Sequence, residues 1–404
     1  MAAAGPLTVL CIASYEKGHE FLREAKRQGC TVLLLTSESL MKTANWPSES
    51  IDEIFYMPDV NKKWNLQHTI LAVSHLARNR KIDRIVPLDD FDLETAASLR
   101  EHMRIPGMGE TTTRYFRDKL AMRARAKFAR LPVPEFVRLL NDGEIHEFTR
   151  GVPAPWILKP RSQAGAIGLK KIAGENELWK ALEALGDDRS FYLLERFIPG
   201  HVHHVDTITF HGELLFCQVS KYGAPPFEVT HQGGVFTTRT LAAQDRKSEE
   251  LCELNWRVLQ AFGLVWGVSH SEFIVAQDGV TYFLETSARV GGANIAELVE
   301  AATGVNLWRE WAKIEVAGED GSYSSPQSKR DAAGLLISLA KEEWPSTEEF
   351  KDPEIVWRMR KPWHVGMIVR SAEHARVEDL LKQYSERVQQ MYMAFQPPPD
   401  RPTH

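Results

Sequence analysis

The sequence has 404 residues, of which 43% are hydrophobic and 25% are charged, and these values are typical of a water-soluble globular protein with two or three domains. Its 49 lysines and arginines stand against 54 aspartates and glutamates, which gives a formal net charge of -5. This balance argues against nucleic acids and anionic membranes as partners, because both attract basic proteins.

The cysteines and the N-terminal stretch indicate where the protein is expected to reside. Cys11, Cys30, Cys217 and Cys252 are spaced too widely to indicate a disulfide framework or a CxxC motif. Cysteines of this kind usually pack as small hydrophobic side chains, so we expect a reducing, cytoplasmic compartment. The first residues lack the basic segment of a signal peptide, and no apolar run is long enough to span a membrane.

The first hundred or so residues alternate between apolar runs and amphipathic segments. The expected elements are a strand at 7–13, a helix within 14–29, a strand at 30–36, a strand at 51–58, a helix at 66–80 and a strand at 82–90. This strand–helix–strand order predicts a parallel sheet in an α/β domain over residues 1–115. The first turn contains no GxGxxG sequence, which argues against a dinucleotide site there.

The character of the sequence changes after a basic helix and a proline-containing turn at Pro132 and Pro134. Short apolar strands then alternate with single helices and hairpin turns, which indicates an α+β domain with antiparallel strands. A polar segment rich in glycine and serine at 317–329 reads as a linker. Beyond it, residues 330–395 are predicted to form a small, β-rich α+β module.

Two lysines are suited to bind phosphate groups. Lys119 opens the basic helix, and Lys159 ends an apolar strand. Lys159 is followed by a loop with Ser162, Gly165 and Gly168, whose small residues allow the backbone to approach polyphosphate oxygens closely. The chain has no Walker A sequence, and the alternative interpretation of this loop is a surface hairpin with basic flanks.

The segment 193–206 could form the base-binding side of a nucleotide site. Glu195 at a strand end, followed by Phe197 and Ile198, could offer a carboxylate and backbone groups to an adenine amino edge within an apolar slot. The alternative is an ordinary strand end with a salt bridge. The histidines at 201, 203 and 204 suggest a metal site, but no Cys or HExxH partner accompanies them. A surface position or a ribose contact is therefore favoured for them.

A predicted hairpin near residue 278 carries two acidic residues. Glu272 lies on its first strand and Glu285 on its second, and Arg289 follows four residues later. Two carboxylates on paired strands provide the oxygen ligands that Mg²⁺ prefers, and an arginine suits a carboxylate or a phosphoryl group. The alternative is a hairpin whose exposed face carries two acids and an arginine without a ligand.

The order of these residues along the chain resembles the ATP-grasp superfamily. Within it, the chain resembles the carboxylate–amine ligases that include dipeptide and L-amino acid ligases, over about residues 1–315. The resemblance implies an ATP-grasp domain at 116–318, with a central lobe at 120–194 and a C-terminal lobe at 195–318. It also implies activation of a carboxylate to an acyl phosphate, which an amine then attacks.

The resemblance assigns a role to each of the site residues. By this resemblance, Lys119 and Lys159 match the phosphate-binding lysines, and residues 162–168 match the lid loop. Glu195 and Ile198 match the hinge segment that binds adenine. Glu272 and Glu285 match the Mg²⁺ ligands, and Arg289 matches the transition-state arginine. Ser287 stands where the family usually has a metal-binding asparagine. Val202 stands where an acidic ribose contact is common, so His203 or Asp206 is expected to serve instead.

We therefore expect an ATP- and Mg²⁺-dependent ligase of small-molecule carboxylate and amine substrates, in which Mn²⁺ could replace Mg²⁺ and which could form a homodimer. The loop at 220–234, with Tyr222, is expected to face substrate. Two alternatives remain: a nucleotide-binding regulatory module that has lost catalysis, and a biotin-carboxylase-like enzyme that uses bicarbonate.

Overall fold

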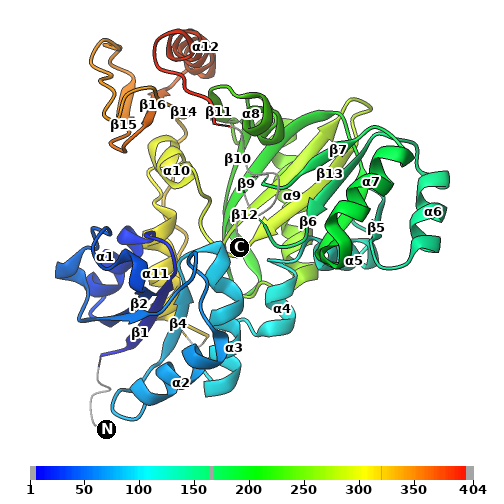
Figure 1. Ribbon diagram of the computed structural model, residues 1–404. Coiled ribbons are helices and arrows are strands. Elements are labelled where there is room, and N and C mark those ends of the chain that lie inside the picture. The colour runs from blue at the N-terminus through cyan, green and yellow to red at the C-terminus, as the bar shows by residue number, and fades with distance from the viewer. Residues whose placement is uncertain (1–5, 164, 166, 320, 397–404) are drawn as a thin grey trace.

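The N-terminal part of the protein is an α/β domain built on a parallel sheet (Figure 1). The computed structural model describes residues 6–163, 165, 167–319 and 321–396. The sheet has the strand order β3-β2-β1-β4, and its strands are β1 (Thr8–Ala13), β2 (Thr31–Ser37), β3 (Glu53–Met57) and β4 (Arg84–Pro87). The helices are α1 (His19–Arg27), α2 (Leu66–Leu76), α3 (Leu93–Met103) and α4 (Glu110–Arg114), with short 3₁₀ turns at Glu38–Leu40, Ser48–Ser50 and Asp90–Asp92. The predicted parallel strand–helix–strand start is confirmed.

The next part of the chain forms a small lobe around a four-stranded antiparallel sheet of order β5-β8-β6-β7. It contains α5 (Lys119–Phe128), β5 (Phe136–Arg138), α6 (Asp142–Gly151), β6 (Trp156–Pro160), β7 (Lys170–Ile172), α7 (Glu175–Leu185), a 3₁₀ helix (Gly186–Phe191) and β8 (Tyr192–Arg196). Asp118 caps α5 by accepting hydrogen bonds from the backbone amides of Leu120 and Ala121. This cap fixes Lys119 at the first turn of the helix.

The remaining strands form one eight-stranded sheet of order β13-β12-β9-β10-β11-β14-β16-β15. Its strands are β9 (Gly200–Phe210), β10 (Glu213–Tyr222), β11 (Phe236–Thr240), β12 (Gly267–Ala276), β13 (Thr281–Ser287), β14 (Ala332–Leu339), β15 (Ile355–Arg358) and β16 (His364–Ser371). The helices of this part are α8 (Pro226–Gln232), α9 (Arg246–Phe262), α10 (Ile295–Thr303), α11 (Leu307–Ala317) and α12 (His374–Met391). Helix α11 packs against α1 and thereby joins this part to the N-terminal domain.

The segment expected to form a small α+β module at 330–395 contains β14, β15, β16 and α12, and it shares a sheet with the preceding lobe. Strand β14 pairs with β11, so the three last strands extend the sheet of the preceding lobe. Helix α12 buries Val377 and Leu380 against β14 and β16. The apolar runs predicted these strands, but a local pattern does not reveal which sheet edge a strand will join.

The cysteines also differ from the sequence expectation. Cys217 on β10 and Cys252 on α9 form a disulfide, with Cα atoms 6.2 Å apart. Helix α9 lies against β10, and this packing brings together two cysteines that are 35 residues apart in the sequence. Cys11 and Cys30 are free and buried, as expected.

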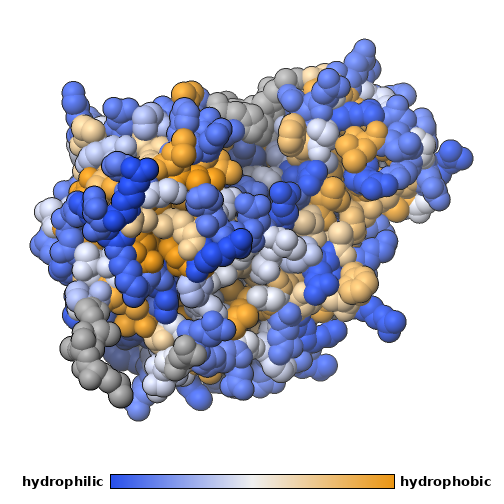
Figure 2. Space-filling view, turned by 90° about the horizontal axis from the view of Figure 1, so that it is seen from below, coloured by the Kyte–Doolittle hydropathy of each residue, from blue (hydrophilic) through white to orange (hydrophobic). Residues whose placement is uncertain are grey.

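The exterior shows the mixture of residue types that is common on folded proteins. From below, hydrophobic residues lie in small groups among hydrophilic ones (Figure 2), as expected because apolar atoms form much of the accessible surface of most folded proteins. None of the described helices combines the length and the apolar character that a membrane span requires.

Candidate active site

The two predicted metal carboxylates lie side by side on paired strands. Glu272 on β12 and Glu285 on β13 are register partners in an antiparallel pair, as the hairpin pattern predicted. The Tyr222 hydroxyl donates a hydrogen bond to Glu272 Oε1 at 2.8 Å. Both carboxylates line the same cavity, so the alternative of an exposed hairpin face is disfavoured.

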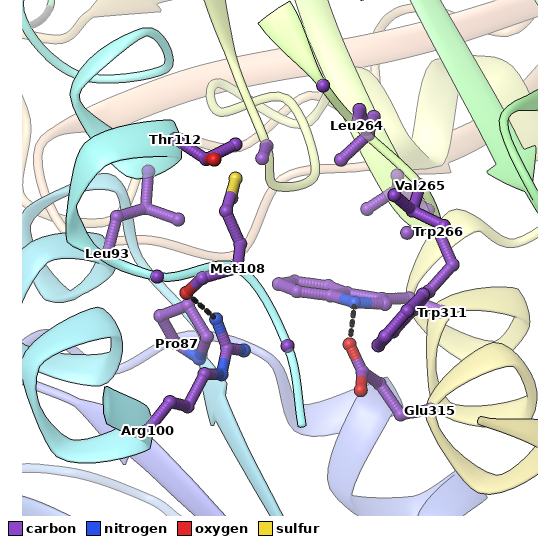
Figure 3. Close-up of a pocket in the computed structure, with 16 residues that line it drawn as sticks. Pro87, Leu93, Arg100, Met108, Thr112, Leu264, Val265, Trp266, Trp311 and Glu315 are labelled. Carbon is purple, nitrogen blue, oxygen red and sulfur yellow. Dashed lines mark hydrogen bonds between the residues drawn. The ribbon is translucent and has the colours of Figure 1, made fainter. Parts of the chain in front are cut away.

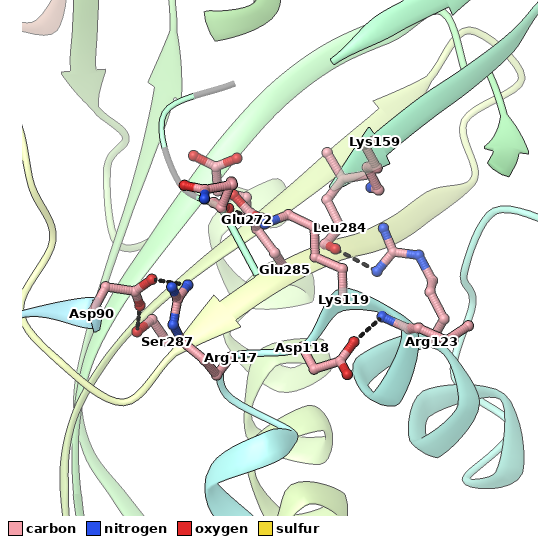
Figure 4. A network of polar contacts seen from close by, with 12 residues as sticks. Asp90, Arg117, Asp118, Lys119, Arg123, Lys159, Glu272, Leu284, Glu285 and Ser287 are labelled. Carbon is pink, nitrogen blue, oxygen red and sulfur yellow. Dashed lines mark hydrogen bonds and ion pairs between the residues drawn. The ribbon is translucent and has the colours of Figure 1, made fainter. Parts of the chain in front are cut away.

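Lys119 contacts the second of these carboxylates. Its Nζ lies 2.7 Å from Glu285 Oε2 and donates to the carbonyl of Gln163 at 2.6 Å (Figure 4). Burial alone would raise the pKa of the Glu285 carboxyl, but the Lys119 ammonium lowers it below its usual value. The Lys119 ammonium group and the carboxylate of Glu285, a predicted Mg²⁺ ligand, are therefore in contact in the cavity.

Lys159, Glu195 and Arg123 form a buried cluster of charges beside this point. Glu195 accepts from Lys159 Nζ and, at 3.0 Å, from Arg123 Nε. Burial lowers the pKa of Lys159 to about 8, an effect that the nearby Glu195 carboxylate partly offsets. The Glu195 carboxylate is thus engaged by cations within the protein. The alternative to an adenine contact was a strand end with a salt bridge, and Glu195 does form such a salt bridge. Contacts of the hinge segment with an adenine edge would therefore come from its backbone rather than from the Glu195 carboxylate.

The cavity that these residues line has a volume of about 390 Å³. Its lining combines apolar side chains, among them Ile198, Ile274 and Leu284, with the two lysines and the two carboxylates. Phe197 and Gly165 also line it, and Lys171 Nζ lies 3.9 Å from the centre of the Phe197 ring.

The structure describes the predicted lid loop at 162–168 except for residues 164 and 166. Gly165 and Gly168 have positive φ angles of 70° and 72°, a conformation that glycine adopts without strain. Ser162 is half-buried, but it is not among the residues that line the 390 Å³ cavity. Residues 164 and 166 lie outside the described part of the chain. The role of this loop stays a prediction.

The two ribose candidates are both engaged within the protein. His203 Nδ1 contacts the carbonyl of His201 at 3.1 Å, and burial lowers the pKa of His203 to about 4. Asp206 is fully buried, and its two carboxylate oxygens contact His204 Nδ1 at 2.7 Å and His270 Nδ1 at 2.9 Å. The geometry therefore disfavours Asp206 as a ribose contact.

A second group of charged residues lies at the end of β13. Asp90, which follows β4 in the N-terminal domain, accepts from Ser287 Oγ and, at 2.7 Å, from Arg117 NH1 (Figure 4). Arg289 Nε lies 3.7 Å from the same carboxylate. Burial would raise the pKa of Asp90, but Arg117 and Arg289 hold it at about 2. Ser287, predicted as a metal ligand, thus bonds a carboxylate in this structure.

These residues surround a small cavity of about 30 Å³, which we call the acceptor cavity. It is lined by Asp90, Arg117, Lys119, His270, Glu285, Ser287 and Arg289, among others. Lys119 and Glu285 line both cavities, so the predicted metal site adjoins the predicted transition-state arginine.

Four residues of this site, Arg117, Arg123, Asp90 and His270, have no role predicted from the sequence. Arg123 lies inside the basic helix, where its charge is one of several, and Asp90 and His270 approach the site from other elements. The acidic run at 89–92, directly after a strand of a parallel sheet, was the available signal for Asp90, because ligands of such sheets bind at the carboxyl ends of strands.

Comparisons with known proteins agree with this geometry. The chain is 26% identical over 272 residues to an L-arginine-specific L-amino acid ligase from Bacillus subtilis, covering 66% of this chain and 64% of that protein. The structure of an L-amino acid ligase from Bacillus licheniformis superposes with a TM-score of 0.75 at 18% identity, covering 98% of this chain and 100% of the other. A biotin carboxylase domain from Hydrogenobacter thermophilus, solved with MgADP, gives a TM-score of 0.70 at 17% identity, covering 95% and 90%. No family model matches the chain.

The structural similarities show that the chain has the ATP-grasp fold, as the sequence predicted. Together with the sequence matches, they confirm the resemblance to the carboxylate–amine ligase branch of that superfamily. The match spans less than two thirds of the length of the Bacillus subtilis protein.

Proposed function

We propose that this ATP-grasp protein is an ATP- and Mg²⁺-dependent ligase that activates a carboxylate as an acyl phosphate, joins it to an amine and releases ADP and phosphate. The observation that supports this most is the pairing of Glu272 with Glu285 beside Lys119, at the junction of the 390 Å³ cavity with the acceptor cavity. Relatives with ligase names support the same class of reaction.

The donor atoms of the cavity fit ATP and Mg²⁺. Carboxylate oxygens are ligands that Mg²⁺ prefers, and lysines bind phosphate groups as point charges. Glu272 and Glu285 would hold the metal, with Mn²⁺ as a substitute, and Lys119 and Lys159 would neutralise phosphate oxygens. The bound metal would contribute by neutralising charge on the transferred group.

The residues of the acceptor cavity would act on both halves of the reaction. In the first half, a carboxylate oxygen would bond to the γ-phosphorus of ATP while the bond from that phosphorus to the β–γ bridging oxygen breaks and ADP leaves. We propose that Arg289 stabilises charge that develops on the transferred phosphoryl group, because it lies beside Glu285 at the end of β13. Asp90 would orient Arg289, since its carboxylate lies 3.7 Å from Nε. The amine nitrogen would attack the acyl carbon, the bond from that carbon to the phosphate oxygen would break, and the amine would release a proton.

The test is a matrix of amino acids and small carboxylic acids, incubated with ATP and Mg²⁺ and assayed for phosphate release and for products by mass spectrometry. A product whose mass equals the two substrates minus water, with one phosphate released per product, supports the proposal. ATP binding without ADP formation across the matrix would instead favour a regulatory nucleotide-binding module. Bicarbonate-dependent ADP formation without an amine would favour a carboxylase.

The organisation into domains at 1–115, 116–318 and 330–395 is part of the same proposal, and limited proteolysis with mass spectrometry tests it. We also propose a homodimer, as the solved biotin carboxylase domain is described as one. Sedimentation velocity would then give about twice the mass of the 45.8 kDa chain.

A further inference from the structure

A third cavity, of about 190 Å³, lies between the N-terminal domain and the C-terminal lobe (Figure 3). Pro87 and Arg100 line it from the N-terminal domain, Met108 from the connecting segment, and Trp311 and Glu315 from α11. Its lining shares no residue with the 390 Å³ cavity or with the acceptor cavity. It is therefore distinct from the proposed ligase site.

Two buried side chains of opposite charge line this cavity. Arg100 and Glu315 are each only 6% exposed. The Arg100 guanidinium donates to the backbone carbonyls of Ile85 and Met108. The Glu315 carboxylate accepts from Trp311 Nε1 at 3.0 Å and also from the side chain of Trp266. Among the described residues, no ion pair of either Arg100 or Glu315 is found.

The two charges influence each other without being in contact. Burial lowers the pKa of Arg100, and the charge of Glu315 partly offsets this by raising it. Burial raises the pKa of Glu315, and the charge of Arg100 partly offsets this by lowering it. The nearby Arg84 guanidinium donates to the backbone carbonyl of Glu315, at 3.0 Å, rather than to its carboxylate. Buried charges that have hydrogen bonds but no ion pair remain costly, so a ligand that carries both opposite charges would stabilise both groups.

The rest of the lining is largely apolar and aromatic. Figure 3 shows Met108 beside Arg100 and the indole of Trp311 beside Glu315, with Leu264 and Trp266 on the side of the C-terminal lobe. Indole rings attract cations as well as apolar groups. The volume equals that of roughly six water molecules at about 30 Å³ each, and it is below the ~300–1,000 Å³ of pockets for larger ligands.

We propose that this cavity binds a free α-amino acid with an apolar side chain, whose carboxylate pairs with Arg100 and whose ammonium group pairs with Glu315 beside Trp311. The apolar side chain packs against Met108 and Trp266. This binding site is separate from catalysis and needs neither ATP nor Mg²⁺. The cavity lies between the two parts of the chain, and Ala288, the neighbour of Arg289, is one of its lining residues. A bound amino acid therefore also stabilises the arrangement of the domains around the acceptor cavity.

Isothermal titration of the full chain with L-leucine, without nucleotide or metal, tests the proposal. The amino acid is expected to bind, whereas 4-methylpentanoate and 3-methylbutylamine, which each lack one charge, bind at least tenfold more weakly. Glu315→Gln is expected to weaken leucine binding at least tenfold. Glu310→Gln is the matched control, because Glu310 is a buried glutamate of the same helix whose carboxylate instead contacts Lys313 and Tyr323.

Two further variants keep the test decisive. Thr112→Phe fills the cavity without changing either charge and should abolish leucine binding even if Glu315→Gln fails to fold. Arg289→Ala should leave leucine binding without nucleotide unchanged, which separates this cavity from the ligase site. No binding of leucine, methionine or phenylalanine to the wild-type chain at 10 mM overturns the proposal. Binding that Thr112→Phe retains, or that Arg289→Ala removes, also overturns it.

Discussion

The buried cluster of Glu195, Lys159 and Arg123 makes a sharp prediction about stability. In Glu195→Gln the side chain keeps its shape but loses its charge, so two buried cations lose their shared anion. Glu195 is 4% exposed, Lys159 5%, and Arg123 fully buried. Removing one member of a buried ion pair typically costs about 3–5 kcal/mol, because the remaining charge stays buried without compensation. We expect a loss of this size in the free energy of unfolding.

Urea unfolding followed by circular dichroism measures this loss, and the same lobe offers a matched control. Glu144 pairs with Arg138 through two hydrogen bonds of 2.7 and 2.8 Å, but both side chains are exposed. Glu144→Gln is therefore expected to leave the unfolding midpoint unchanged. If Glu195→Gln unfolds at the same urea concentration as Glu144→Gln, Glu195 does not balance the two cations and the charge argument is wrong.

Three further predictions concern the proposed ligase reaction. Glu285→Gln should fold normally by circular dichroism yet lose Mg²⁺-dependent ADP formation; normal turnover would contradict the metal assignment. Arg289→Ala should bind ATP nearly as the wild type in equilibrium titrations while its rate of ADP formation falls on the order of a hundredfold, as expected for a contact made mainly in the transition state; unchanged turnover with lost ATP affinity would make it a nucleotide clamp. Finally, Lys159 has a lowered pKa of about 8, so in the free protein it loses its positive charge as the pH rises through that value. ATP affinity should therefore fall above pH 8, and Lys159→Arg should remove this pH dependence. An equal pH dependence in both proteins would assign it to another group.

Local patterns were sufficient for the parts of the site that lie within one hairpin or one helix. The alternation of residues around the turn near 278 predicted that Glu272 and Glu285 are paired, and the register confirms it. Asp118 caps α5, a signal that can be read from neighbouring residues and that fixes Lys119 at the start of the helix. Such features depend on contacts between residues close in sequence.

Contacts between distant segments could not be predicted in the same way. Asp90 and Ser287 are 197 residues apart and meet only because the end of β4 lies beside the end of β13. The contact of Asp206 with His270 likewise depends on the pairing of β9 with β12, whereas His204 lies two residues from Asp206 on β9 itself. The sequence pattern predicts that a buried aspartate needs partners, but it does not say which strand supplies them.

The charges of the proposed site balance one another in pairs, and this explains how such a polar cavity can be stable. Lys119 contacts Glu285, Lys159 contacts Glu195, and Arg117 contacts Asp90. Mg²⁺ alone at Glu285 would release Lys119 as an unpaired buried cation, and a phosphate alone at Lys119 would release Glu285 as an unpaired anion. When both arrive together, the metal takes the carboxylate and the phosphate takes the ammonium, so neither charge is left uncompensated. The arrangement therefore favours the complex of nucleotide and metal over either component, which is what a phosphoryl-transferring site requires.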